Sequence, residues 1–181
     1  MAGDEDTLAG RLLVVEYEQV KEEQRARIGF RDNLLYATLA SMAAIITFTL
    51  QKSGHVELLL LLPPASVFLG WTYLVNDEKI SAIGRYIREE LDPRLTALVP
   101  THSRVFGWET AHRSDRRRVS RKRLQLGVDL LIFCAAPLAA LVVYWSYGPV
   151  TAVLLTVSLV ESALIAVLGA QIARYADLRR P

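Results

Sequence analysis

Four long runs of apolar residues, none of which contains a lysine or an arginine, constrain this chain more than any other feature. The runs are residues 34–50, 58–75, 128–145 and 150–172. Hydrophobic residues make up 52% of the 181, and this segregation leaves most of the charged residues, 22% of the chain, to the segments between the runs. A helix needs about 20 mostly apolar residues, and at least about 17, to cross the hydrocarbon layer. Each run therefore predicts a transmembrane helix.

The runs also lack the pattern of water-soluble helices. A soluble helix of this length carries a polar stripe that recurs every 3.6 residues, because one of its faces meets solvent. Within the runs only Asp129 and Glu161 carry a charge. A soluble bundle of unusually buried helices is the alternative. The pattern favours an all-α, polytopic membrane protein with four transmembrane helices in two hairpins.

The basic residues predict the orientation of these helices. Residues 77–123 contain twelve Lys or Arg residues, the segment before Leu34 contains five and the tail after Ile172 contains three, whereas the two hairpin turns contain only Lys52. Lys and Arg are retained on the cytoplasmic side during insertion. We therefore expect a protein of the plasma (inner) membrane with both termini and the middle loop on the cytoplasmic side. The excess of Arg over Lys, 17 to 4, indicates a GC-rich bacterial genome.

This orientation divides the chain into five segments. We expect them to be a cytoplasmic N-terminal helix (1–33), a first transmembrane hairpin (34–75), a cytoplasmic helical loop (76–127), a second transmembrane hairpin (128–172) and a cytoplasmic tail (173–181). Asp6 can cap the N-terminal helix, which no proline interrupts before the first run. A charged helix is expected from about Glu109 to Arg123 and should continue into the third run.

Two features of the cytoplasmic loop suggest what it contacts. Its isoleucine and leucine residues at positions 80, 83, 87 and 91 form one apolar face, which lies either in the headgroup layer or on the N-terminal helix. The basic segment RSDRRRVSRKR directly precedes the third run. A basic run in this place is expected to meet anionic lipid headgroups, so no nucleic-acid partner is predicted.

Glu161 is the residue best suited to a function within the bilayer. It lies twelve positions after Pro149 and thirteen before Arg174, which places it near the midplane. A charged carboxylate there costs at least about 2.5 kcal/mol on insertion scales. It is either protonated and hydrogen-bonded to a neighbour such as Ser41, Thr47 or Ser66, or it lines a wet path and meets a cation.

The last run also carries a ridge of small residues that would let another helix approach closely. The candidate interface residues are Ser158, Ser162, Ala166 and Ala170. Glu161 borders this ridge, either inside one subunit or between subunits of a homo-oligomer. In the second run, Pro63 and Pro64 remove two backbone donors and are expected to kink the helix, with a hinge or gate as the alternative.

The sequence contains no constellation typical of an enzyme. It has no glycine-rich phosphate loop and no Ser/His/Asp set. Cys134 lies within an apolar run, and its spacing from His55, His102 and His112 does not fit a metal site. We therefore predict neither catalysis nor a bound metal or cofactor.

The layout of the chain resembles that of known membrane effectors. The first predicted hairpin follows a charged segment, EYEQVKEEQRARIGFRD, and the second begins at the end of a basic segment, RSDRRRVSRKRLQLGVD. This arrangement resembles the SLATT-type and related four-span families of bacterial conflict and antiphage systems. The resemblance implies an oligomeric pore or channel-like effector that responds to a cytoplasmic signal. The alternatives are a non-conducting scaffold that binds a cytoplasmic protein and, third, a small dimeric proton-coupled transporter.

Overall fold

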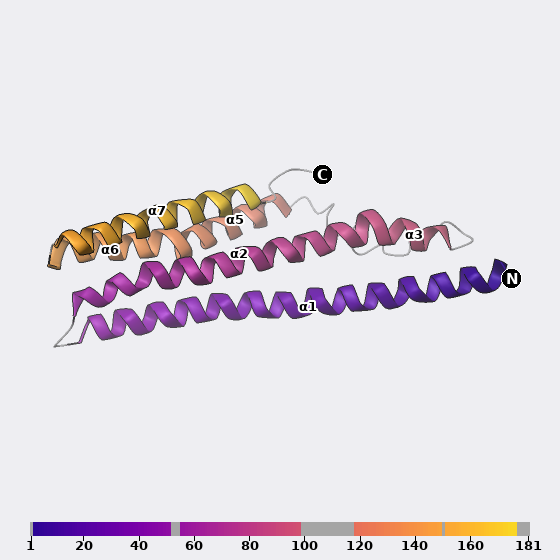
Figure 1. Ribbon diagram of the computed structural model, residues 1–181, viewed down its shortest axis with the longest axis horizontal. Coiled ribbons are helices and arrows are strands. Elements are labelled where there is room, and N and C mark those ends of the chain that lie inside the picture. Colours follow the sequence, from indigo (N-terminus) through magenta and orange to yellow (C-terminus); the bar gives the residue numbers. More distant parts are fainter. Residues whose placement is uncertain (1, 52–54, 99–117, 150, 177–181) are drawn as a thin grey trace. The chain divides into compact units, whose positions relative to one another are not determined.

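The computed structural model describes residues 2–51, 55–98, 118–149 and 151–176, and all regular elements in these ranges are helical (Figure 1). The elements are α1 (Ala2–Thr49), the 3₁₀ helix η1 (Val56–Leu61), α2 (Leu62–Tyr86), the π-helix η2 (Ile87–Leu91), α3 (Asp92–Ala97), α5 (Arg118–Leu130), the π-helix η3 (Leu131–Ala135), α6 (Ala136–Tyr147) and α7 (Ala152–Tyr175). The expectation of an all-α chain is confirmed for the described ranges.

Three continuous helical stretches are long and apolar enough to cross a membrane. They are Val56–Ala97, Ser120–Tyr147 and Ala152–Tyr175. They contain the second and third predicted spans and residues 152–172 of the fourth. The charged start of α5 continues into the third span as expected. The predicted part of that helix at residues 109–117 lies outside the described residues.

The first predicted span lies at the end of α1 and is shorter than the others. Because α1 ends at Thr49, the last 18 residues of the helix include Asp32 and Asn33 in addition to the apolar residues. These two polar residues lower the mean hydropathy of this stretch, so the end of α1 is not among the three helices named above. The four-span topology therefore stays a prediction.

The start of α1 differs from the expected one. The helix begins at Ala2, so Asp6 lies within it and is not its N-cap. An acidic N-terminal turn suits a helix, because the partial positive charge of that helix end favours nearby carboxylates. As the lack of a proline allows, one helix runs without a break from the charged N-terminal segment into the first apolar run.

The chain divides into two compact units. Residues 1–30 and 76–118 belong to the first, which we call the polar unit, and residues 31–75 and 119–180 belong to the second, the apolar unit. The boundary between Val75 and Asn76 coincides with the end of the second apolar run. Both α1 and α2 contribute residues to both units.

In the polar unit, the first part of α1 packs antiparallel to the end of α2. Tyr86 donates a hydrogen bond from its hydroxyl to Glu16, and the Gln24 amide lies 3.4 Å from the Ile80 carbonyl. As residue numbers rise along α1, those of the partners fall, which defines an antiparallel helical hairpin. The apolar face predicted at residues 80–91 lies on the end of α2 and on η2, and this part of the chain bonds to the N-terminal helix through Tyr86 and the Ile80 carbonyl.

The seam of this hairpin contains a local change of helix type. Ile80 and Ile83 are half-buried, and Ile87 and Leu91 are fully buried. The spacing from Ile87 to Leu91 falls in the π-helix η2, where the Asp92 amide donates to the Ile87 carbonyl, five residues earlier. A π turn contains one residue more than an α turn, so the buried face of the helix shifts by one residue along the sequence. This shift occurs just before Pro93, which has no N–H to donate.

The apolar unit has a core shared by segments from both ends of the chain. One cluster of buried residues comprises Leu34, Tyr73, Leu74, Phe133, Leu168 and Ile172. Gly70 lies so close to this cluster that an added Cβ would be 2.8 Å from Leu168 Cδ2 and 2.8 Å from Phe133 Cδ1. The missing side chain at Gly70 thus permits α2 to pack tightly against α7 and η3.

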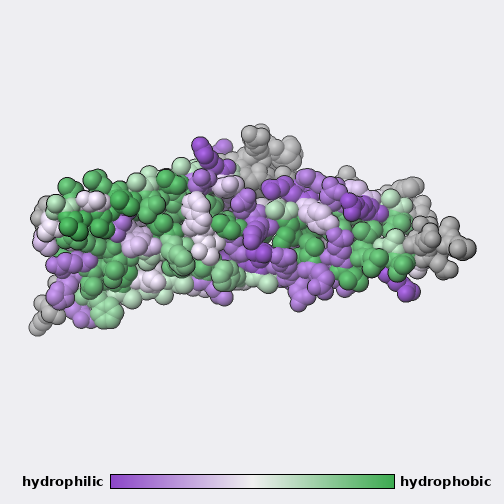
Figure 2. Space-filling model, viewed as in Figure 1, coloured by the Kyte–Doolittle hydropathy of each residue, from purple (hydrophilic) through white to green (hydrophobic). Residues whose placement is uncertain are grey.

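The outer surface of the apolar unit is itself apolar. Figure 2 shows hydrophobic residues gathered over α6 and α7. Large side chains on these helices are widely exposed, among them Val142 (66%) and Val153 (72%). A water-soluble domain rarely exposes a contiguous patch of this kind, whereas a helix that faces lipid has no reason to bury it.

Candidate functional site in the apolar unit

Glu161 occupies a core position on α7. This helix begins after Thr151, whose side-chain oxygen accepts a hydrogen bond from the Leu154 amide at 3.3 Å. Its buried positions follow one another at steps of three and four, and they are Ser158, Glu161, Ile165, Leu168 and Ile172. Only 8% of Glu161 is exposed. The carboxylate thus takes a place in the buried stripe that the other positions fill mostly with apolar side chains.

The carboxylate of Glu161 has a buried oxygen without a partner. Within the described part of the chain, Glu161 Oε2 and Ser66 Oγ are the buried side-chain polar atoms that make no hydrogen bond. The expected bond from Ser41, Thr47 or Ser66 to a protonated Glu161 is therefore absent. A buried polar atom without a partner is costly, which makes such an atom a candidate for function.

Two hydroxyls on α1 form hydrogen bonds within their own helix. Ser41 Oγ donates to the Ala37 carbonyl at 2.8 Å, and Thr38 Oγ1 donates to the Leu34 carbonyl at the same distance. A serine or threonine within a helix finds an acceptor four residues earlier, so it satisfies itself locally. Ser66 departs from this pattern, since its Oγ is enclosed and makes no such bond.

A groove of about 360 Å³ lies between the first part of α2 and the Glu161 region of α7. It is lined by Pro63, Pro64, Val67, Phe68, Trp71, Thr72, Glu161 and Leu164. Glu161 is the only ionisable residue among these lining residues. The Thr72 hydroxyl donates to the Phe68 carbonyl at 2.9 Å, so its hydrogen is already in use. The groove therefore combines an apolar, partly aromatic wall with a single carboxylate.

The two prolines of this groove lie where the 3₁₀ helix η1 gives way to α2. The Leu62 amide donates to the Leu59 carbonyl, which completes the 3₁₀ segment. Because neither Pro63 nor Pro64 has an N–H, the Leu60 carbonyl loses both of the donors that would follow it in a helix. The change of helix type accompanies this loss. A hinge or gate at these prolines stays a prediction.

The ridge of small residues on α7 turns from the core to the surface. Ser158 is buried and Ser162 is half-buried, whereas Ala166 and Ala170 are exposed. A step of four residues advances by about 40° around a helix of 3.6 residues per turn, so such a ridge winds around α7. Its first part, at Ser158 and Ser162, packs within the apolar unit. Ala166 and Ala170 form a small, smooth surface on the outside of the apolar unit.

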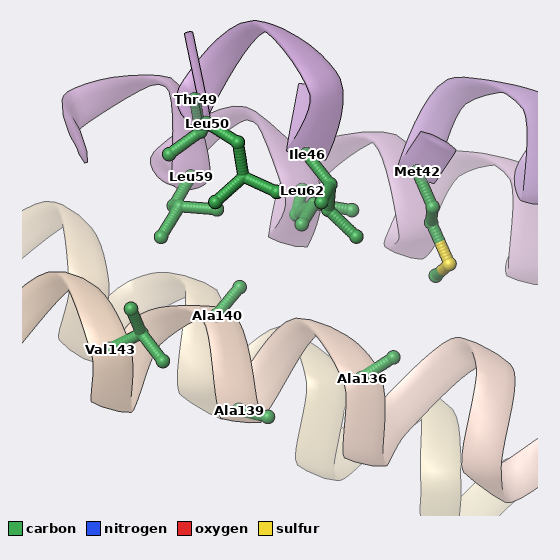
Figure 3. Close-up of a pocket in the computed structure, with 10 residues that line it drawn as sticks. All are labelled: Met42, Ile46, Thr49, Leu50, Leu59, Leu62, Ala136, Ala139, Ala140 and Val143. Carbon is green, nitrogen blue, oxygen red and sulfur yellow. The ribbon is translucent and has the colours of Figure 1, made fainter. Parts of the chain in front are cut away.

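A second groove, of about 380 Å³, lies between α6 and the segments around the first hairpin turn, and the sequence did not reveal it. Figure 3 shows its lining side chains pointing toward one another from two walls. One wall comprises Met42, Ile46, Thr49, Leu50, Leu59 and Leu62, and the other comprises Ala136, Ala139, Ala140 and Val143. The alanines of α6 leave this space, and no charged residue lines it.

The described residues contain no group of three or more His, Cys, Asp or Glu side chains positioned to hold a metal ion. Comparisons of the chain with protein-family models, with curated proteins and with solved structures find no match. The candidate site is therefore defined by the chemistry of its own residues.

Proposed function

We propose that this chain is a four-span protein of the bacterial inner membrane that assembles into an oligomeric pore or channel-like effector. The observation that carries this proposal is the buried, unpartnered carboxylate of Glu161. Ionisable residues within membrane spans are expensive, and they mark ion or proton pathways more often than structural sites. Spans that only anchored a cytoplasmic domain would gain nothing from a carboxylate in this position.

The topology belongs to the proposal. Three helices are long and apolar enough to span a membrane, and the apolar end of α1 packs with them in one unit through Leu34 and Met42. An even number of spans places both termini on the same side of the membrane, and the basic residues of the middle loop and the terminal segments assign that side to the cytoplasm. Anionic headgroups then meet the Arg-rich segment before α5.

The exposed part of the α7 ridge supports assembly into a homo-oligomer. Ala166 and Ala170 lie on the surface of the apolar unit, where small side chains allow two helices to approach closely. A second subunit on this surface would border the helix that carries Glu161. The polar unit would receive the cytoplasmic signal, as the resemblance to SLATT-type effectors implies.

A non-conducting scaffold is the second candidate, and one feature of the polar unit favours it. Leu8, Leu12 and Val15 lie at steps of four and three on α1, and each is more than half exposed. These residues lie away from the hairpin seam at Glu16 and Gln24. Such a strip suits the docking of an amphipathic helix from a cytoplasmic protein.

Ion leakage from liposomes distinguishes the two candidates. We would reconstitute the wild type, Glu161→Gln and a control, Glu57→Gln, whose carboxylate is half exposed in η1, and size each detergent-extracted protein in parallel. The pore predicts an oligomer that leaks, a change in leakage in Glu161→Gln and none in Glu57→Gln. Tight vesicles that contain a monomeric wild type would instead support the scaffold.

A further inference from the structure

The groove beside Glu161 has the chemistry of a binding site for a particular class of ligand. We propose that it binds a lipophilic, monovalent organic cation with aromatic substituents, whose charge lies at the Glu161 carboxylate and whose rings lie against Phe68 and Trp71. This inference goes beyond the proposed pore and does not rest on it, since a protein that conducts no ions could bind the same ligand.

The charge of the ligand follows from the Glu161 carboxylate. Glu161 is one of the residues that line the groove, and its enclosed Oε2 atom has no hydrogen-bond partner among the described residues. The four apolar runs contain no Lys or Arg that could neutralise it. In a medium of low dielectric constant, an opposite charge in contact with a carboxylate is attracted far more strongly than in water. A cation is therefore the ligand that this position favours.

The walls of the groove indicate an organic cation rather than a metal ion. Hard metal ions such as Ca²⁺ require six or more oxygen ligands, whereas the polar lining consists of Glu161 and Thr72, with the indole N–H of Trp71 as a donor only. The remaining lining residues are Pro, Val, Leu and Phe. A ligand that satisfies this site must carry its own apolar surface around its charge.

The aromatic residues account for the rings of the ligand. Phe68 and Trp71 stand three positions apart on α2 and so share one face of the helix. Both residues line the groove, and they are 73% and 45% exposed, so neither ring is enclosed by the rest of the apolar unit. Aromatic faces attract cations, and they also stack with the rings of a ligand. A volume of about 360 Å³ is within the range of small-molecule sites.

The position of the groove also suits a ligand that arrives through the bilayer. Pro64 and Phe68 are exposed on the outside of the apolar unit, so the groove opens on the surface that faces lipid. Lipophilic cations enter the hydrocarbon layer, whereas hydrated inorganic ions do not. The ligand would thus reach Glu161 sideways, without passing through an aqueous pore.

Equilibrium binding of tetraphenylphosphonium to the full-length protein in nanodiscs tests this proposal. We expect saturable binding with one site per chain, on top of a linear partition into empty nanodiscs. Glu161→Gln should weaken the binding at least about tenfold, and Trp71→Ala about fivefold through the lost aromatic contact. Glu57→Gln should bind as the wild type does. Triphenylphosphine oxide, which is neutral, should not compete.

Two results would overturn the proposal. One is a wild type that takes up tetraphenylphosphonium only in proportion to the lipid; the other is saturable binding that Glu161→Gln leaves unchanged. Circular dichroism and gel filtration establish that each variant is folded. If Glu161→Gln fails to fold, two results still test the proposal. Unchanged binding in Trp71→Ala, or displacement of tetraphenylphosphonium by the neutral phosphine oxide, would contradict it. The pore is tested separately by leakage without this ligand, so the failure of one proposal is distinguishable from that of the other.

Discussion

Asn76 and Arg27 bond to each other in both directions across the helical hairpin of the polar unit. Asn76 Nδ2 donates to the Arg27 carbonyl at 2.6 Å, and Arg27 Nη1 lies 3.4 Å from Asn76 Oδ1. Asn76 is only 5% exposed and is the first residue after the second apolar run. Arg27 also donates to Glu23 through Nε at 2.8 Å. The pair therefore fixes the register of α1 against α2 where the polar unit begins.

Asn76→Ala should destabilise this hairpin. The substitution removes both hydrogen bonds and leaves the Arg27 side chain with one partner fewer, a loss of about 1–3 kcal/mol for a buried polar group. The measurement is thermal unfolding of the purified protein, followed by far-UV circular dichroism. Asn33→Ala is the matched control, because Asn33 is exposed. Equal melting temperatures for the two variants would show that the pair does not hold the hairpin.

Tyr86 should make the polar unit sensitive to alkaline pH. Its hydrogen bond to Glu16 raises the pKa of the phenol above 10.0, and desolvation acts in the same direction. Since the folded state then holds the proton more tightly than the unfolded state, the stabilisation is complete below pH 10.0 and is lost as the pH rises through the raised pKa. Loss of the proton removes the donor and places a second negative charge beside Glu16.

Unfolding as a function of pH tests this coupling. The wild type should lose stability above pH 10.0, and Tyr86→Phe should lack that component of the loss. Tyr175→Phe, which changes an exposed tyrosine of the apolar unit, should behave as the wild type. Identical alkaline profiles for the wild type and Tyr86→Phe would contradict the role assigned to this hydrogen bond.

Gly70→Ala should destabilise the apolar unit. The new Cβ would come within 2.8 Å of Leu168 and Phe133, both of which are completely buried and have little room to move. Overpacking of this kind costs about 1–3 kcal/mol. Gly127→Ala is the control, because nothing lies within 4 Å of its added Cβ. That variant should gain up to about 1 kcal/mol from better helix propensity, and a loss of stability equal to that of Gly70→Ala would contradict the packing described.

The location of residue 7 tests whether the end of α1 crosses the membrane. In a Cys134→Ser background, an impermeant maleimide applied to intact cells should label Gln51→Cys, in the predicted outer turn. Thr7→Cys and Ala173→Cys should react only after lysis. If the first apolar run did not cross, Thr7→Cys would be labelled from outside. That outcome would reduce the topology to three spans.

The helices were predictable from the sequence because hydropathy adds up along the chain. The apolar face at residues 80–91 follows from the residues themselves, and the structure buries its last two members, Ile87 and Leu91, completely. The π-helices were not predictable. η2 and η3 each end two residues before a proline, Pro93 and Pro137. A proline has no N–H, so a carbonyl one turn before it loses its usual donor. Whether the helix then changes to π-type bonding depends on the packing around that turn, which the sequence does not show.

The candidate site was predictable only in part. Glu161 stands out in the sequence as an isolated acid in an apolar run. Its lack of a hydrogen bond could not be predicted, because a hydroxyl such as that of Ser41 can bond to its own helix, here to the Ala37 carbonyl, instead of to another helix. The aromatic groove arises from the packing of α2 against α7, which no spacing within either helix indicates.

The stability of Glu161→Leu tests most directly the claim that Glu161 serves a function and not the fold. Thermal unfolding would be compared in one detergent for the wild type, Glu161→Leu and, as a control on the exposed face of α7, Val160→Leu. Because the carboxylate has a buried oxygen without a partner, its replacement by leucine should stabilise the protein by about 1–3 kcal/mol, the cost of an unsatisfied buried polar group, and should abolish leakage. A lower melting temperature in Glu161→Leu than in the wild type would show instead that the carboxylate holds the helices together.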